Sequence, residues 1–179
     1  MGQIASLFCL TEQDFQLLTA DHAAFDWSQP QLDGEGFNKT FEGLRFVLSK
    51  GRDAETTALV EQIFEPWSFV GEEIDYENID WDQVSDDFPF DAQPTYYNPP
   101  ETVDAIAAFL ATVTDEEFKQ AFDPEELNQA EVYPGRVWNR ETAPNIGYNE
   151  RDMLAELHLL QNFFARIQQQ GNYCVCFVG

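Results

Sequence analysis

Both ends of the chain carry short runs of apolar residues that predict strands. Residues 4–10 (Ile-Ala-Ser-Leu-Phe-Cys-Leu) stop at Thr11, which is a good helix N-cap, and residues 173–178 follow Gly171. A strand that is apolar throughout is usually covered on both faces of its sheet. We therefore expect the C-terminal strand to lie centrally, beside the N-terminal strand.

Apolar residues spaced three and four positions apart predict helices between these two strands. The first should run from Thr11 to near Asp21 and the second should begin near Asn38. A third should span residues 54–64, and a fourth should follow Pro99–Pro100, since proline fits the first turn of a helix.

Helices in the second half of the chain have clear signals at their starts and ends. Thr114 and Glu117 form a capping box, and residues 123–127 (Asp-Pro-Glu-Glu-Leu) predict another brief turn of helix. The last helix has the clearest periodicity and should end near Gly171. One face of it carries Met153, Leu157, Leu160, Phe164 and Ile167.

Glycine and proline mark the segments that should be irregular. Residues 22–36 and 131–148 contain both and are predicted to be loops. Gly43 stands inside the second predicted helix, where glycine lowers helix stability, so it indicates a close packing contact. With 179 residues and 15% aromatic residues, the chain should fold as one compact α+β domain over residues 1–179. We expect a small mixed sheet that includes both terminal strands, packed by several helices.

Residues 65–100 differ in composition from the rest of the chain. Acidic and aromatic residues alternate there, prolines interrupt them, and no Lys or Arg occurs between Arg52 and Lys119. We expect a long excursion with one short strand, whose aromatic residues either pin it to the domain or anchor an interface.

The net charge is the most unusual feature of the composition. Asp and Glu number 33 against nine Lys and Arg, which gives a formal charge of −24. Such a charge repels nucleic acids and anionic membranes and attracts basic protein surfaces. High solubility, or a generally acidic proteome, explains the same charge without a partner. Because the sequence shows neither a signal peptide nor an apolar run that could span a bilayer, we expect a cytoplasmic protein.

Motifs that would indicate catalysis or metal binding are missing from the sequence. No dinucleotide, phosphate-loop, nucleophile-elbow or zincin pattern occurs, and Cys9, Cys174 and Cys176 are an odd set without a Cys-x-x-Cys pair. Residues 75–82 fail as an EF-hand, since Ile79 and Asp80 replace the required fifth and sixth residues. We expect no cofactor and no metal. The missing motifs favour a non-enzymatic protein and leave an enzyme with an unusual site as the alternative.

Several segments in order resemble the YfbM-like family of domains of unknown function. These are Met1-Gly2-Gln3-Ile4-Ala5, the helix of residues 37–48, Tyr97-Asn98-Pro99-Pro100-Glu101-Thr102-Val103, and Val132-Tyr133-Pro134 followed by Trp138. Together with the closing helix and strand they span nearly the whole chain. The resemblance implies a mixed α+β domain and no established activity.

The chain departs from that family's pattern at three places. Phe41 stands where the family typically has Trp, Arg45 stands where it has His, and the region of Gly71 is mostly acidic instead of glycine-rich. If the family histidine has a chemical role, this chain lacks it.

Two functional hypotheses follow. The first is a non-enzymatic protein that binds a basic protein partner, as an immunity or antitoxin-like inhibitor or as a mimic of the charge of DNA. Its predicted partner-binding residues are Glu72, Glu73, Asp75, Tyr76, Glu77, Asp80, Trp81, Asp82, Asp86 and Asp87.

The alternative hypothesis is an enzyme or small-ligand sensor with an unrecognised pocket around Tyr133. His158 lies beside the apolar face of the last helix and fits a hydrogen-bonded structural residue better than a base. The predicted pocket residues are Tyr97, Tyr133, Arg136, Trp138, Arg140 and His158.

Overall fold

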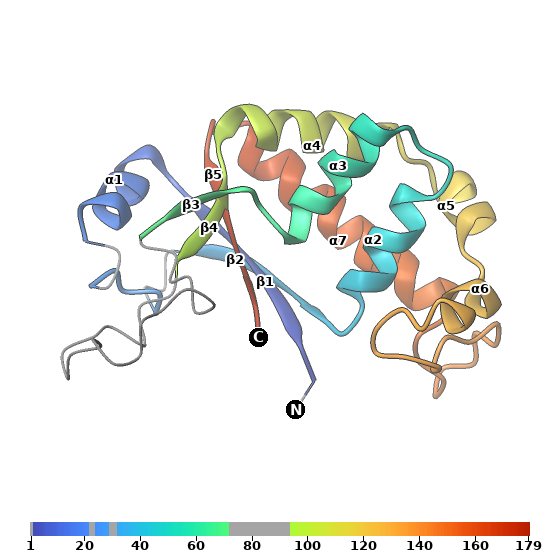
Figure 1. Cartoon of the computed structure of the whole chain (residues 1–179). Helices are drawn as coiled ribbons and strands as arrows, with labels where there is room; N and C mark the ends of the chain where they lie inside the picture. Colours follow the sequence, from blue (N-terminus) through green and yellow to red (C-terminus); the bar gives the residue numbers. More distant parts are fainter. Residues whose placement is uncertain (1, 22–23, 29–31, 72–93) are drawn as a thin grey trace, which may run out of the picture.

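A computed structural model describes residues 2–21, 24–28, 32–71 and 94–179. In this part of the chain a five-stranded sheet is packed by helices, most of them on one face (Figure 1). The elements are β1 (Ile4–Leu10), α1 (Glu12–Ala20), β2 (Asp33–Asn38), α2 (Phe41–Ser49), α3 (Ala54–Phe64), β3 (Ser68–Val70), β4 (Thr95–Asn98), α4 (Pro100–Thr112), α5 (Asp115–Ala121), α6 (Pro124–Gln129), α7 (Glu150–Gln168) and β5 (Tyr173–Val178).

The sheet has the strand order β2-β1-β5-β4-β3, so β5 is central and lies beside β1, as the apolar pattern predicts. All four neighbouring pairs are antiparallel, where we expected a mixed sheet. Apolar alternation reads the same in either direction, so the pattern does not specify strand direction. The α+β class is confirmed.

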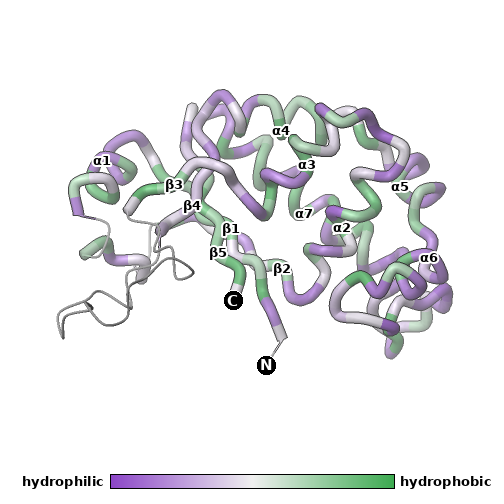
Figure 2. Tube along the Cα trace, in the orientation of Figure 1, coloured by the Kyte–Doolittle hydropathy of each residue, from purple (hydrophilic) through white to green (hydrophobic). Residues whose placement is uncertain are grey.

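Two separate apolar layers cover the two faces of the sheet. Cys174 and Cys176 face α2, α3, α4 and α7, whereas Val175 faces α1 and the aromatic residues near it. In Figure 2 the green, hydrophobic stretches of β1 and β5 run between these layers. Successive strand residues point to opposite faces, which is why an all-apolar strand suits this position.

Helix α7 forms the centre of the helical layer. All five residues of the predicted apolar face are fully buried. The capping box at Thr114 is present, with Glu117 as its partner, and Thr11 forms a second one with Asp14. These helix starts are therefore confirmed at the level of individual hydrogen bonds.

Two predicted boundaries were wrong. Strand β2 occupies the end of the predicted loop 22–36, and α2 begins at Phe41 and not near Asn38. Gly34 and Gly36 weaken the strand signal of β2, whose stability comes from pairing with β1 and from burial of Phe37. The chain turns at Lys39, which has a φ of 63°.

Residues 65–100 contribute two short strands to the sheet, β3 and β4, where one was expected. No helix within the described ranges has both the length and the apolar character needed to cross a membrane.

Candidate functional site

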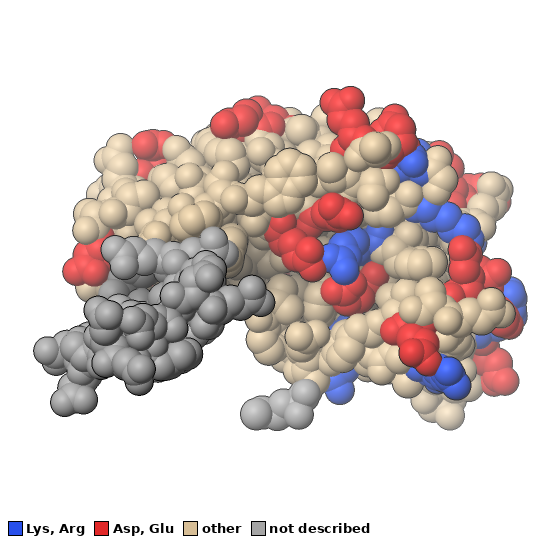
Figure 3. Space-filling model, viewed as in Figure 1, with Lys and Arg blue, Asp and Glu red and all other residues tan. Residues whose placement is uncertain are grey.

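An open groove of about 810 Å³ lies between α2, α3, α6 and the segment that contains Tyr133. Figure 3 shows acidic and basic side chains meeting over this part of the surface, whereas the described surface over the sheet carries few charges. Its lining residues are Glu42, Arg45, Phe46, Ser49, Lys50, Thr57, Glu61, Glu65, Glu126, Ala130, Glu131, Val132 and Tyr133.

The groove is acidic because its lining holds five carboxylates and two cations. Arg45 on α2 is bound twice: its guanidinium donates to Glu42 at 2.6 Å and to Glu65, just beyond α3, at 2.5 Å. Lys50 follows α2, donates to the carbonyl oxygen of Ala121 at 3.2 Å and forms an ion pair with Glu126. Both cations of the lining are thus neutralised by carboxylates of the same lining.

Two carboxylates of the groove are not engaged by those cations. Glu131 pairs with Arg136 outside the lining, at 2.6 Å, and both side chains are largely exposed. Because an exposed ion pair such as Glu131–Arg136 contributes little to stability, Glu131 can exchange Arg136 for another cation at small cost. Glu61 forms no ion pair with any described residue. The groove therefore offers negative charge to a cationic group from solution.

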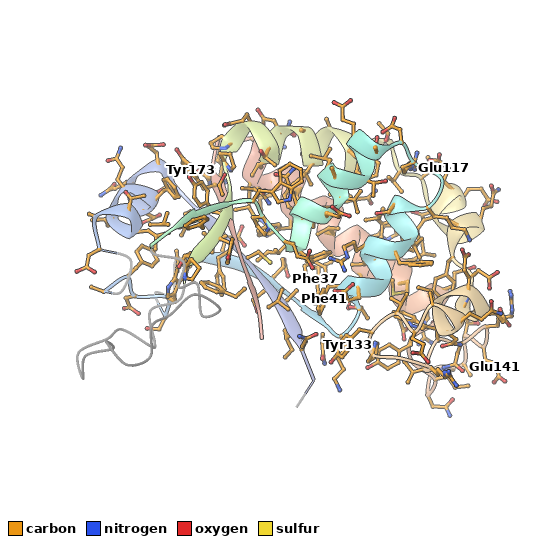
Figure 4. The ribbon with its side chains drawn as sticks, viewed as in Figure 1. Phe37, Phe41, Glu117, Tyr133, Glu141 and Tyr173 are labelled. Carbon is orange, nitrogen blue, oxygen red and sulfur yellow. The ribbon has the colours of Figure 1, made fainter. Side chains whose placement is uncertain are left out.

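Tyr133 forms one wall of the groove and joins it to the start of the chain. The hydroxyl of Tyr133 accepts a hydrogen bond from the backbone N–H of Gln3 at 2.6 Å. Its ring packs beside Phe41 with centroids 6.1 Å apart, and Figure 4 shows the two side chains together below Phe37. The Tyr133–Pro134 peptide bond is cis. An aromatic wall beside carboxylates suits an ammonium or guanidinium group.

The residues of the predicted alternative pocket do not come together. Trp138 is buried and donates from its indole N–H to the carbonyl oxygen of Val132 at 3.0 Å, so it belongs to the core. Tyr97 lies on the opposite face of the sheet, against Phe15 and Tyr173. Of the six predicted residues, Tyr133 lines the groove and Arg136 reaches it through Glu131.

The other two predicted pocket residues form ion pairs elsewhere. Arg140 pairs with Asp123 and Glu125 around the start of α6. His158 on α7 lies 2.7 Å from a carboxylate oxygen of Asp115 at the start of α5. That hydrogen bond is the largest cause of the lowered pKa of Asp115. His158 thus connects two helices.

All ten predicted partner-binding residues fall in 72–87 and lie outside the described residues. Within the described ranges, no three His, Cys, Asp or Glu side chains are placed to hold a metal ion.

Sequence reasoning missed the groove itself. The available signal was helical spacing: Glu61 and Glu65 are four residues apart, and Glu42 and Arg45 are three apart. Glu42 and Arg45 lie on α2, whereas Glu65 directly follows α3 and lies one turn after Glu61. What the spacing does not reveal is that α2 and α3 turn these pairs toward each other.

Comparisons with known proteins agree with this fold. A family model described as "Domain of unknown function (DUF1877)" matches residues 1–177. A solved structure described as a protein of unknown function, YfbM from Escherichia coli, is similar with a TM-score of 0.63 and 14% sequence identity, over 98% of this chain and 99% of that one. No curated protein matches the chain. Since the family model covers almost every residue, the chain belongs to the DUF1877 family of domains of unknown function.

Proposed function

We propose that this protein is a non-enzymatic binding protein that engages a basic surface of a partner protein, in the manner of an immunity protein or inhibitor. The observation that supports it most strongly is the acidic groove, in which five carboxylates face two cations that are already paired. A basic side chain entering the groove meets Glu61, which forms no ion pair with a described residue, the exposed Glu131 and an aromatic wall. A net charge of −24 favours the same partner through long-range attraction.

The distribution of cations over the described surface supports the proposal. All nine Lys and Arg lie from Lys39 to Arg166, and six of them form ion pairs with carboxylates of the described residues. Pairing within the chain cancels the field of those cations at short range. The surface that a partner meets is therefore governed by the excess carboxylates.

A direct test uses a hexa-arginine peptide as the probe, titrated calorimetrically into the full chain at low salt. The groove variant Glu61→Gln/Glu131→Gln should weaken binding by about five- to tenfold, since each lost exposed pair contributes about 0.5 kcal/mol or slightly more. The matched control Glu101→Gln/Asp104→Asn removes the same charge from the exposed face of α4 and should change binding much less. Added salt should weaken binding to all three proteins.

The residues predicted from the sequence need their own variant. Asp80→Asn/Asp82→Asn/Asp86→Asn/Asp87→Asn removes four charges from that stretch and leaves the groove intact. A larger loss with this variant than with the groove variant would place the interface on 72–87. Absence of any peptide binding at low salt, or equal losses in the groove and control variants, would contradict the proposal.

A small cationic ligand is the second candidate, because a volume of about 810 Å³ falls in the range of small-molecule sites. Spermidine and free arginine separate the two functions. Binding of spermidine at least as tight as that of the peptide, and lost in the groove variant, would favour a small-ligand sensor over a protein-binding role.

A further inference from the structure

Two oxygen atoms at the junction of α2 and α7 are buried without a formed hydrogen bond. Thr40 directly precedes α2 and is only 7% exposed, and its Oγ1 forms no hydrogen bond of full geometry with a described residue, although it lies close enough to Glu156 to act on it. On α7, Oε2 of the half-buried Glu156 is in the same state. A buried polar atom without a partner costs about 1–3 kcal/mol, so such a pair is expected to have a compensating role.

The two side chains are neighbours across the junction. Burial raises the pKa of Glu156, the Thr40 hydroxyl opposes that rise, and the charge of Asp152, one turn earlier on α7, adds to it. Asp152 is the charged side chain of the described residues that acts on Glu156, and it is itself paired with Arg151 at 2.6 Å. From the side of α2 the group that faces Glu156 is the neutral Thr40. No described cation compensates an ionised Glu156.

We propose that Glu156 and Thr40 form a proton-linked contact that holds the start of α2 against α7. When Glu156 carries a proton taken from solvent, the junction holds no buried charge, and the carboxyl and the Thr40 hydroxyl can hydrogen-bond with either one as the donor. When Glu156 loses the proton, the Thr40 hydroxyl can still donate to the carboxylate, but the charge remains in a desolvated position beneath the first turn of α2. Packing of α2 on α7 then weakens.

The consequence reaches the groove, because Glu42 and Arg45 follow Thr40 on the same helix. Loosening the start of α2 would move both residues. The inference does not depend on the proposed function, however, since its tests measure titration, stability and hydrogen exchange and no binding.

The sign of the pH effect follows from the raised pKa. A carboxyl whose pKa is higher in the folded than in the unfolded protein contributes stability below its unfolded pKa of about 4.3 and loses it as pH rises through the folded value. Gln keeps a neutral donor at every pH. Glu156→Gln and wild type should therefore melt alike near pH 4, and the variant should melt higher by about 2–4 °C above the folded pKa.

One control variant and two further measurements complete the test. Asp104→Asn removes an exposed carboxylate of α4 and should give a difference from wild type that does not grow with pH in this way. Thr40→Val should raise the titration midpoint of Glu156, followed by carboxyl NMR of the full chain, because the hydroxyl that favours the charged form is gone. At pH 8, the amides of α2 should exchange faster in wild type than in Glu156→Gln.

The inference is overturned if Glu156 titrates near pH 4.3 and the melting difference is independent of pH. An unchanged midpoint in Thr40→Val, or equal α2 exchange in wild type and Glu156→Gln, would remove the link to α2.

Discussion

Gly43 of α2 lies directly against the six-membered ring of Trp138, so closely that a β-carbon at Gly43 would overlap the indole. Trp138 is held in place by its backbone N–H, which donates to the side-chain oxygen of Asn128 at 3.1 Å, and by edge-to-face contacts with Phe122 and Tyr148. The contact docks the segment after α6 onto α2. It thereby positions the Tyr133 wall of the groove.

Gly43→Ala should destabilise the fold. Alanine favours a helix by about 1 kcal/mol over glycine, but forcing the ring aside costs typically 1–3 kcal/mol. We expect a net loss of up to about 2 kcal/mol in urea unfolding, with altered tryptophan fluorescence. Gly36→Ala, where a β-carbon meets no atom within 4 Å, should leave the fluorescence unchanged. Equal or greater stability of Gly43→Ala would contradict the contact.

Arg166 joins the end of α7 to the edge strand β2. Its guanidinium donates to both carboxylate oxygens of Asp33, at 2.6 and 2.9 Å, and lies 3.5 Å from Glu35. Since the pair is partly exposed, Asp33→Asn should lower the free energy of unfolding by only about 1 kcal/mol. The loss should shrink in high salt. Glu35→Gln should lower the free energy of unfolding by less than Asp33→Asn does. If the loss in Asp33→Asn is unaffected by salt, Asp33 stabilises the protein by packing and not by its charge.

Asp115 depends on His158 for its lowered pKa. The contribution of such an aspartate to stability is present above its unfolded pKa and disappears as pH falls through its folded pKa. His158→Gln should raise the pKa of Asp115, measured by carboxyl NMR, and acid unfolding should begin at a higher pH. Lys119→Gln removes a weaker influence on Asp115 and should shift its pKa less; the reverse order would show that the hydrogen bond is not the main cause.

The three cysteines should be unreactive in the folded protein. Burial raises the pKa of all three thiols, that of Cys176 to about 12 and that of Cys174 well above its ordinary value. Since the thiolate is the reactive form, iodoacetamide at pH 8 should label native protein slowly and urea-unfolded protein quickly. Mass spectrometry locates the label. Rapid labelling of Cys174 in native protein would show that the sheet opens locally.

Much of the fold was predictable from local patterns. The face of α7 from Met153 to Ile167, the capping box at Thr114 and the central place of β5 all depend on periodicity or on single hydrogen bonds between near neighbours. Strand β2 was not predictable in this way, because its Gly34 and Gly36 favour a loop. Pairing with β1 determines its conformation.

The candidate site was only partly predictable. Tyr133 was recognised, whereas Trp138 was assigned to the pocket and belongs to the core under Gly43. Aromatic residues in irregular segments suit either role, and only the surroundings decide which one they take.

The order of apolar and polar residues determined the helices and the buried strands of this protein, and its composition determined the large negative charge, since these depend on residues close in sequence or on their sum. Only the tertiary structure decided the strand directions, the groove and the junction of Thr40 with Glu156. These arise where segments far apart in the chain meet, and the energy of such meetings depends on burial and pairing that a linear pattern does not contain.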